Sequence, residues 1–143
     1  MGLPNNAVNH EKFRQNAILT ATKEDLTLML YNGALKFANQ ALDALENDDK
    51  EKAHDLIIRV QDIIREFQIT LNREYDISKN FASMYDYMYR RLVEANIKKD
   101  AEILIEVRDL IREFRDTWKE AMKLARQQSA SSKSATSAVI HSV

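Results

Sequence analysis

Glu51 and His54 have the spacing of a metal site. They form a Glu-x-x-His arrangement, which places both side chains on one face of a helix, as in di-iron helical bundles. Such a site needs the motif on two helices together with further inward-facing glutamates. The chain has three histidines in all, and the other two, His10 and His141, lie near its ends. We therefore predict that His54 is a surface residue and that the protein holds no metal and no other cofactor. The alternative, a metal-binding bundle, would retain stoichiometric metal through purification.

Residues for covalent catalysis are scarce in this chain. It has no cysteine, and its serines lie mainly near the C-terminus, whereas nucleophilic catalysis needs a serine or cysteine beside a base. Paired carboxylates do occur, at Glu24-Asp25 and at Asp48-Asp49. Both pairs stand at expected helix starts, where they stabilise the positive end of the helix dipole. We predict that the protein is not an enzyme.

Tyrosines are concentrated between residues 85 and 92, where the sequence reads YDYMYRRL. At helical spacing Tyr85, Tyr89 and Leu92 share one face, whereas Tyr87 points elsewhere. Two interpretations are open. The tyrosines can be core residues whose hydroxyls reach solvent, or they can line a semi-exposed groove for a peptide, because tyrosine offers a large contact area at low entropic cost.

Gly33 is the only glycine beyond Gly2, and it stands inside an expected helix. Glycine in a helix interior costs about 0.5–1 kcal/mol relative to alanine. Its presence indicates that another backbone comes close at this point. Either a neighbouring helix or a bound partner helix can be the cause.

The helix around Gly33 has more apolar residues than one contact requires. Thr22 is a suitable N-cap for it, and it is expected to run from about Lys23 to Glu46. One apolar seam has alternating gaps of three and four, typical of packed helices: Leu28, Tyr31, Leu35, Ala38, Leu42 and Leu45. A surplus lies around this seam: Leu26, Met29, Leu30, Ala34, Phe37 and Ala41. Either this is the central helix of a bundle, or it presents a bare face to a partner.

Three more helices follow, at about 50–72, 77–95 and 101–126. Asp48 or Asp49 caps the first, Asp76 or Ser78 the second and Asp100 the third, and Asn96 is expected to end the second in the left-handed conformation. The first of these helices is expected to face inward with Ala53, Leu56, Val60, Ile63 and Phe67, beside a second stripe of Ile57, Ile64 and Leu71. The second is expected to face inward with Phe81, Met84, Tyr85, Met88, Leu92 and Ala95. The third is expected to face inward with Leu104, Val107, Ile111, Phe114, Trp118, Ala121 and Ala125. Short connections force neighbouring helices to run antiparallel.

The sequence therefore predicts an all-α protein, an antiparallel up-down-up-down four-helix bundle over residues 23–126. Residues 1–22 are expected to form a flexible N-terminal segment with a short cap helix. Residues 127–143, rich in serine and alanine, are expected to form a disordered tail because they lack apolar content. Only two glycines and one proline among 143 residues are too few for a sandwich or a barrel.

The charge and hydropathy of the chain argue against several classes of partner and location. The net charge is -1 and no basic cluster is present, which argues against nucleic acid. No run of about 18 uncharged apolar residues occurs, which argues against a membrane span, and the N-terminus does not have the pattern of a secretory signal. We expect a soluble protein.

Three blocks of the sequence resemble one protein family. They are LTLMLYNG at residues 26–33, YDYMYRRL at 85–92 followed by Ala95-Asn96, and RDTWK at 115–119. In order and spacing they are similar to the bacterial flagellar secretion chaperones that bind flagellin, the FliS family, over roughly residues 13 to 122. Phe13, Lys23 and Asn32 replace the tyrosine, proline and aspartate that are frequent in the family.

The resemblance implies a cytoplasmic four-helix bundle with a definite client. It implies that the protein binds the disordered C-terminal segment of newly made flagellin, prevents its premature polymerisation and hands it to the flagellar type III export apparatus. The flagellin segment is expected to become helical in hydrophobic grooves, and the N-terminal segment to cover part of that surface in the free chaperone. A helix-in-groove mode with coupled folding of the client agrees with the apolar surplus of the predicted helices.

From this we predict two groups of partner-binding residues. Phe13 and Ile18 are expected to belong to the movable cap. The residues expected to line grooves are Leu30, Ile57, Ile64, Leu71, Tyr85 and Tyr89. We expect a monomer or weak dimer in the free state. The alternative function is a structural homodimer that buries the surplus apolar face against a second copy.

Overall fold

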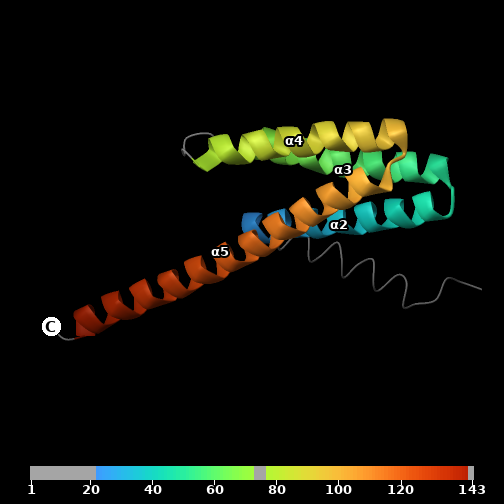
Figure 1. The fold of residues 1–143 in the computed structure, drawn as a ribbon. Helices are drawn as coiled ribbons and strands as arrows, with labels where there is room; N and C mark the ends of the chain where they lie inside the picture. The colour runs from blue at the N-terminus through green and yellow to red at the C-terminus, as the bar shows by residue number, and fades with distance from the viewer. Residues whose placement is uncertain (1–21, 73–76, 142–143) are drawn as a thin grey trace, which may run out of the picture.

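The protein is an all-helical bundle in a computed structural model (Figure 1) that describes residues 22–72 and 77–141, residues 77 and 131–141 by their backbone alone. Four helices make up the described part: α2 Lys23–Glu46, α3 Lys50–Thr70, α4 Ile77–Lys98 and α5 Ala101–His141. The all-α four-helix bundle predicted from the sequence is confirmed. The predicted cap helix, with Phe13 and Ile18, lies outside the described residues.

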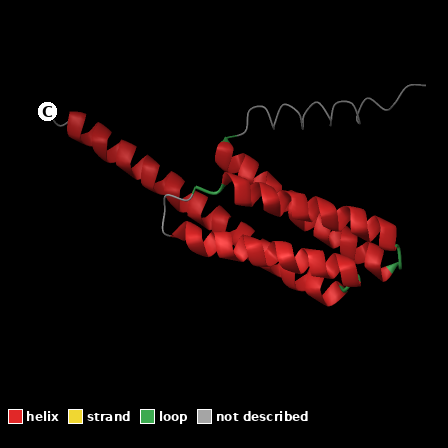
Figure 2. Ribbon diagram, turned by 90° about the horizontal axis from the view of Figure 1, so that it is seen from above, coloured by secondary structure: helices red, strands yellow, loops and turns green. Residues whose placement is uncertain are grey.

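The helices pack as a closed square. Helix α2 contacts α3 and α5, and α4 contacts the same two helices from the opposite corner, as Figures 1 and 2 show from two directions. The largest side chains fully buried between them come from three helices: Ile57, Val60 and Ile64 of α3, Met88 and Leu92 of α4, and Leu104, Val107 and Ile111 of α5. Alanines supply most of the buried positions of α2. In the described residues, no helix is long and apolar enough to cross a bilayer.

Local capping chemistry fixes where most helices begin. The Thr22 hydroxyl accepts a hydrogen bond from the Asp25 N–H at 3.1 Å, and the Asp49 carboxylate accepts one from the Lys52 N–H at 3.1 Å. The Asp100 carboxylate accepts one from the Glu102 N–H at 2.9 Å. Each bond satisfies an amide that has no partner within its helix. The predicted N-caps of α2, α3 and α5 are confirmed.

The predicted left-handed cap at Asn96 is wrong. Helix α4 continues to Lys98, and Lys99 takes the left-handed conformation with φ of 51°. The Asp100 N–H then donates to the Ala95 carbonyl at 3.0 Å, which closes the helix in a Schellman turn. Asn96 is buried instead, because its side-chain amide donates to the His54 ring at 2.9 Å and so ties α4 to α3.

Helix α5 is longer than predicted. We expected it to end near Arg126, before a disordered tail, and the structure continues it as helix through His141, beyond the end of the bundle (Figures 1 and 2). The added stretch contains no glycine or proline that would stop a helix. Every side chain from 123 to 130 is exposed, so this part of α5 adds no buried side chain to the core.

The buried side of α5 also shifts near its departure from the bundle. Ala121 and Ala125, predicted to point inward, are exposed, whereas Met122 is buried. At this level α5 meets the first turn of α2, where the Trp118 indole N–H donates to the Glu24 carbonyl at 3.3 Å. Because α5 crosses toward α2, the residues in contact no longer follow the seam of the central bundle.

Candidate interaction surface

Apolar side chains lie bare along the outer edge between α2 and α3. Leu26 is 38% and Met29 41% exposed, and Leu30 and Phe37, next along the same side of α2, are half-buried. Ile63 of α3 is also half-buried and borders them. These five residues define what we call the α2–α3 apolar surface. Contiguous exposed apolar area of this kind marks interaction sites on soluble domains.

Gly33 lies within the α2–α3 apolar surface, and the free fold does not require it. A β-carbon built there would meet the Ile63 Cδ1 atom at 3.8 Å, an ordinary van der Waals distance. Its backbone is regular helix without a positive φ. The interpretation that a neighbouring helix excludes a side chain at Gly33 is therefore wrong. Close approach of a bound partner is the other interpretation offered by the sequence.

One cation borders this surface. The Arg59 guanidinium carbon lies 5.3 Å from the centre of the Phe37 ring, a cation–π contact that contributes about 0.5–1 kcal/mol at exposed sites. The contact leaves the ring half-buried. A partner that reached Phe37 would therefore meet an aromatic face already ordered by an arginine.

Three predicted groove residues are reached by solvent, at separate places. Leu30 belongs to the α2–α3 apolar surface, Leu71 is half-buried just after α3, and Tyr89 is half-buried between α3 and α4. The Arg65 guanidinium carbon lies 4.6 Å from the Tyr89 ring centre. A hydrogen bond from Arg65 lowers the pKa of the Tyr89 hydroxyl, because the cation stabilises the phenolate.

The other three predicted groove residues lie in the core, and their assignment to an exposed groove needs correction. Ile57 and Ile64 are fully buried and Tyr85 is 6% exposed. Ile57 and Ile64 of the second apolar stripe of α3 are covered within the bundle, and the periodicity of the sequence does not distinguish a stripe covered by a helix from one left bare. In the described structure these side chains stabilise the bundle.

A buried pair of tyrosines lies at the centre of the core. The hydroxyls of Tyr31 and Tyr85 are 2.8 Å apart, in hydrogen-bond contact between α2 and α4. The Phe67 ring lies between them, with its centre 4.4 Å from the Tyr31 ring and 5.5 Å from the Tyr85 ring. Burial raises the pKa of both hydroxyls above the usual 10.0, because the phenolate would be desolvated.

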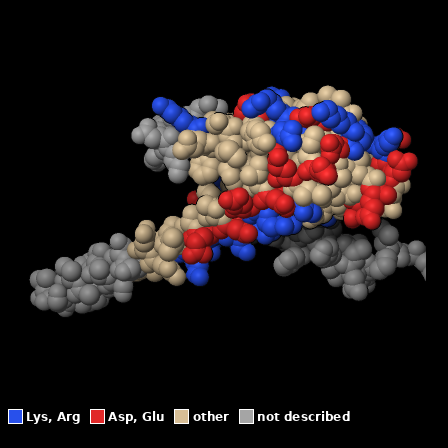
Figure 3. Space-filling model, in the orientation of Figure 1, with Lys and Arg blue, Asp and Glu red and all other residues tan. Residues whose placement is uncertain are grey.

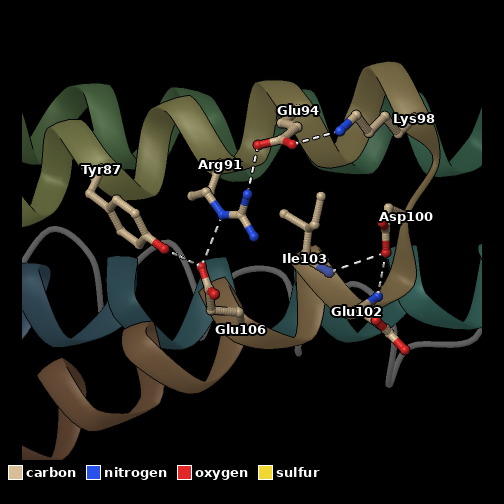
Figure 4. Close-up of polar contacts among 8 residues, drawn as sticks. All are labelled: Tyr87, Arg91, Glu94, Lys98, Asp100, Glu102, Ile103 and Glu106. Carbon is tan, nitrogen blue, oxygen red and sulfur yellow. Dashed lines mark hydrogen bonds and ion pairs between the residues drawn. The ribbon is translucent and has the colours of Figure 1, made fainter.

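Tyr87 points away from this core toward α5, as the spacing predicted. Its hydroxyl donates to the Glu106 carboxylate at 2.7 Å, and Arg91 donates to the same carboxylate at 3.0 Å (Figure 4). Arg91 also contacts Glu94 at 2.6 Å, and Glu94 accepts from Lys98 at 2.8 Å. The hydrogen bond from Tyr87, then Arg91, lowers the pKa of Glu106. This network joins α4 to α5.

The residues with metal-site spacing, Glu51 and His54, lie at the start of α3. His54 is exposed, as predicted, and its ring nitrogen Nδ1 accepts from Asn96. Across residues 22–72 and 77–141, no three histidine or acidic side chains come together as a group that could hold a metal ion.

Comparison with known proteins decides the family. A family model described as "Flagellar protein FliS" matches residues 5–125. The flagellar secretion chaperone FliS of Bacillus subtilis (strain 168) is 49% identical to this chain over 115 residues, which cover 80% of the chain and 86% of that relative. The protein of the same name from Escherichia coli (strain K12) is 29% identical over 111 residues, 76% of this chain and 82% of that relative.

This chain belongs to the FliS family. The resemblance seen in the sequence is thereby confirmed, and the chain has a chaperone role in flagellar secretion. The family match spans α2, α3, α4 and the part of α5 that packs in the bundle. The extension of α5 past residue 125 lies outside it.

Sequence reasoning missed part of the surface that this FliS-family fold leaves bare. Leu26, Met29 and Phe37 were counted as surplus apolar residues of the first helix, but none was predicted to bind a partner. The signal was available, since these residues fall on the side of α2 that holds Gly33. Buried alanines occupy the inner side of α2, so a bulky residue outside that seam is a candidate for exposure.

Proposed function

We propose that this protein binds the C-terminal segment of flagellin on the α2–α3 apolar surface. Bound in this way, the flagellin segment is kept from polymerising before secretion and is delivered to the flagellar type III export apparatus. The chaperone acts in the cytoplasm and without catalysis. Leu71 and Tyr89 extend the contact toward α4, and Phe13 and Ile18 belong to a segment that covers the surface when no client is bound.

The exposure of Leu26 and Met29 carries this proposal. Together with the half-buried Leu30, Phe37 and Ile63 they form an apolar strip along two antiparallel helices. Such a strip fits the apolar face of an amphipathic helix, whose anchors recur every three or four residues. A disordered client segment that folds on this strip buries its own apolar residues at the same time.

The missing side chain at Gly33 also supports the proposal that a client helix packs on α2. It lies in the middle of the strip and leaves room above α2 that an alanine in the free protein could fill without a clash. A client helix that crosses α2 at this point would come closer than it could over a larger residue, as small residues allow between packed helices.

The test is a calorimetric titration with a peptide that covers about the last 60 residues of the cognate flagellin. We expect one-to-one binding, a strongly negative heat-capacity change and a gain of helix by circular dichroism, because apolar burial is coupled to folding of the peptide. A folded protein that gives no heat and no gain of helix would contradict the proposal.

The homodimer is the competing explanation of the same exposed strip. Sedimentation of the free protein at micromolar concentration separates the two, because a stable dimer that buries Leu26 and Met29 would leave no surface for a client. We expect a monomer or a weak dimer that the flagellin peptide dissociates.

A further inference from the structure

A second seam of half-buried apolar side chains lies between α4 and α5, on the side of the bundle opposite the α2–α3 apolar surface. Half-buried apolar side chains from both helices form its floor: Phe81 and Met84 of α4, Leu110 and Phe114 of α5. The rings of Phe81 and Phe114 meet edge to face with centres 5.6 Å apart. These four residues define the α4–α5 groove.

Carboxylates line the α5 side of this groove. They recur at gaps of three and four, which keeps them on one side of the helix: Glu106, Asp109, Glu113, Asp116 and Glu120. In Figure 3, which faces α4 and α5, acidic side chains form a row along α5. Four of them, with Arg112 and Thr117, line an open hollow of about 600 Å³ on α5 itself, with no residue of α4 in its lining.

Part of this acidic row has no counterion within the described chain. Asp109 contacts Arg108 and Arg112, and Asp116 contacts Arg115. Glu113 and Glu120 make no ion pair with any described residue. Their charges are available to a cation from outside.

The α4 side of the groove supplies no compensating charge along most of its length. Between residues 77 and 89 the charged residues are Lys79 and Asp86, and Figure 3 shows this half of α4 as a mostly uncharged area beside the acidic row. Arg91 lies at one end, where it is occupied by Glu106 and Glu94. The groove is therefore apolar along its floor and negative along one edge.

We propose that the α4–α5 groove docks an amphipathic helix of a partner protein that has an apolar face and a row of lysines or arginines along one edge. The apolar face packs on Phe81, Met84, Leu110 and Phe114, and the basic edge lies against Glu113 and Glu120. From Glu106 to Glu120 the acidic row is about 21 Å long, since each helical residue adds about 1.5 Å. A docked helix of about four turns matches that length.

The docking site of this partner differs in position from that of the flagellin segment. The α2–α3 apolar surface lies on the other two helices of the bundle. The two surfaces can therefore be occupied together, which would let the chaperone contact a second protein while it holds its client. The inference does not depend on which client is bound.

The experiment uses the full chain and a defined probe. The probe is a labelled helical peptide of about four turns with leucines along one face and lysines along one edge, and a second peptide has glutamate at the lysine positions. We expect the lysine peptide to bind at least about tenfold more tightly than the glutamate peptide, with an affinity that falls as salt rises. Equal binding of both peptides would overturn the proposal.

Variants locate the site. We expect the double variant Glu113→Gln with Glu120→Gln to bind the lysine peptide about five- to tenfold more weakly than the parent, because two unpaired carboxylates are removed. Asp55→Asn with Asp62→Asn, an equal charge change at exposed positions of α3, should alter the affinity for the lysine peptide less than about twofold. Equal weakening by both would mean non-specific attraction and would contradict the assignment. Displacement of the lysine peptide by the flagellin segment would contradict a separate groove.

Discussion

Helix α2 has two apolar sides that differ in what they contact. The inner side, with Tyr31, Ala34, Leu35 and Ala38, is sealed in the bundle, whereas the outer side leaves Leu26 and Met29 bare. The inner side is sufficient to form the core, because the described helices already pack around it on all sides. Bare apolar area adds nothing to that core and carries a risk of aggregation, and this difference is the physical basis of our proposal that the outer side binds a partner.

The largest effect on stability should come from a cavity in the core against which the inner side of α2 packs. Ile64→Ala removes a fully buried side chain, and we expect a loss of about 2–5 kcal/mol in the free energy of unfolding because a cavity remains. Urea titration followed by circular dichroism measures it. A loss below about 0.5 kcal/mol, the usual range for surface substitutions, would mean that Ile64 is not a core residue.

The tyrosine pair should give the next largest effect. Tyr31→Phe or Tyr85→Phe alone leaves one buried hydroxyl without a partner, and we expect each to cost about 1–2 kcal/mol. The double variant should cost less than the sum, since no hydroxyl is then left unpaired. Additive losses would show that the two hydroxyls do not depend on one another.

The same pair predicts a response to alkali. The folded-state pKa of both hydroxyls is raised, so their contribution is complete below the unfolded value of about 10 and is lost as pH rises above it. Unfolding by denaturant between pH 9 and about 11 should show the parent weakening more steeply than the double phenylalanine variant. If the free energy of unfolding fell equally steeply with pH in both proteins, the buried tyrosine pair would not be the cause of the alkaline response.

A substitution at Gly33, at the centre of the outer side, should stabilise the free protein instead of destabilising it. Gly33→Ala is expected to raise the free energy of unfolding by about 0.5–1 kcal/mol, because alanine favours helix and its β-carbon has room. The same change should weaken binding of the flagellin segment if a helix crosses there. A destabilised free protein would show that the fold itself requires the glycine.

The smallest effect should come from the exposed polar network. Glu106 has a lowered pKa in the fold, so its ionised form stabilises the protein above the usual value of about 4.3, and this contribution disappears as pH falls through the folded value. Glu106→Gln should cost a few tenths of a kcal/mol at pH 7, because solvent screens the contacts. It should also flatten the acid dependence, whereas Glu113→Gln, which breaks no described ion pair, should leave it unchanged.

Much of the fold could be predicted because local chemistry determines it. The caps at Thr22, Asp49 and Asp100 are chosen by side-chain oxygens that reach amides a few residues away. The end of α4 could not be predicted in this way. Asn96 was the better local candidate, but its contact with His54 on another helix keeps it inside α4.

The site could be predicted less well, for a related reason. On helices with several apolar stripes, the sequence does not reveal which stripe a neighbour will cover. Ile57 and Ile64 were assigned to a groove and are fully buried in the core, while Met29 was not assigned to the site and is exposed. Only the order of the helices around the square, a tertiary property, separates these cases.

The most direct test of the account compares two bare apolar residues of nearly equal exposure. Met29 is 41% exposed on the α2–α3 apolar surface, and Ile105 is 39% exposed on α5. Calorimetric titration of Met29→Asp and Ile105→Asp with the flagellin C-terminal peptide, on samples whose thermal unfolding is also recorded, isolates the surface from the fold. We predict that both variants unfold within about 0.5 kcal/mol of the parent and that only Met29→Asp loses binding, by at least about tenfold. Equal binding by the two variants would contradict the claim that the outer side of α2 holds the client.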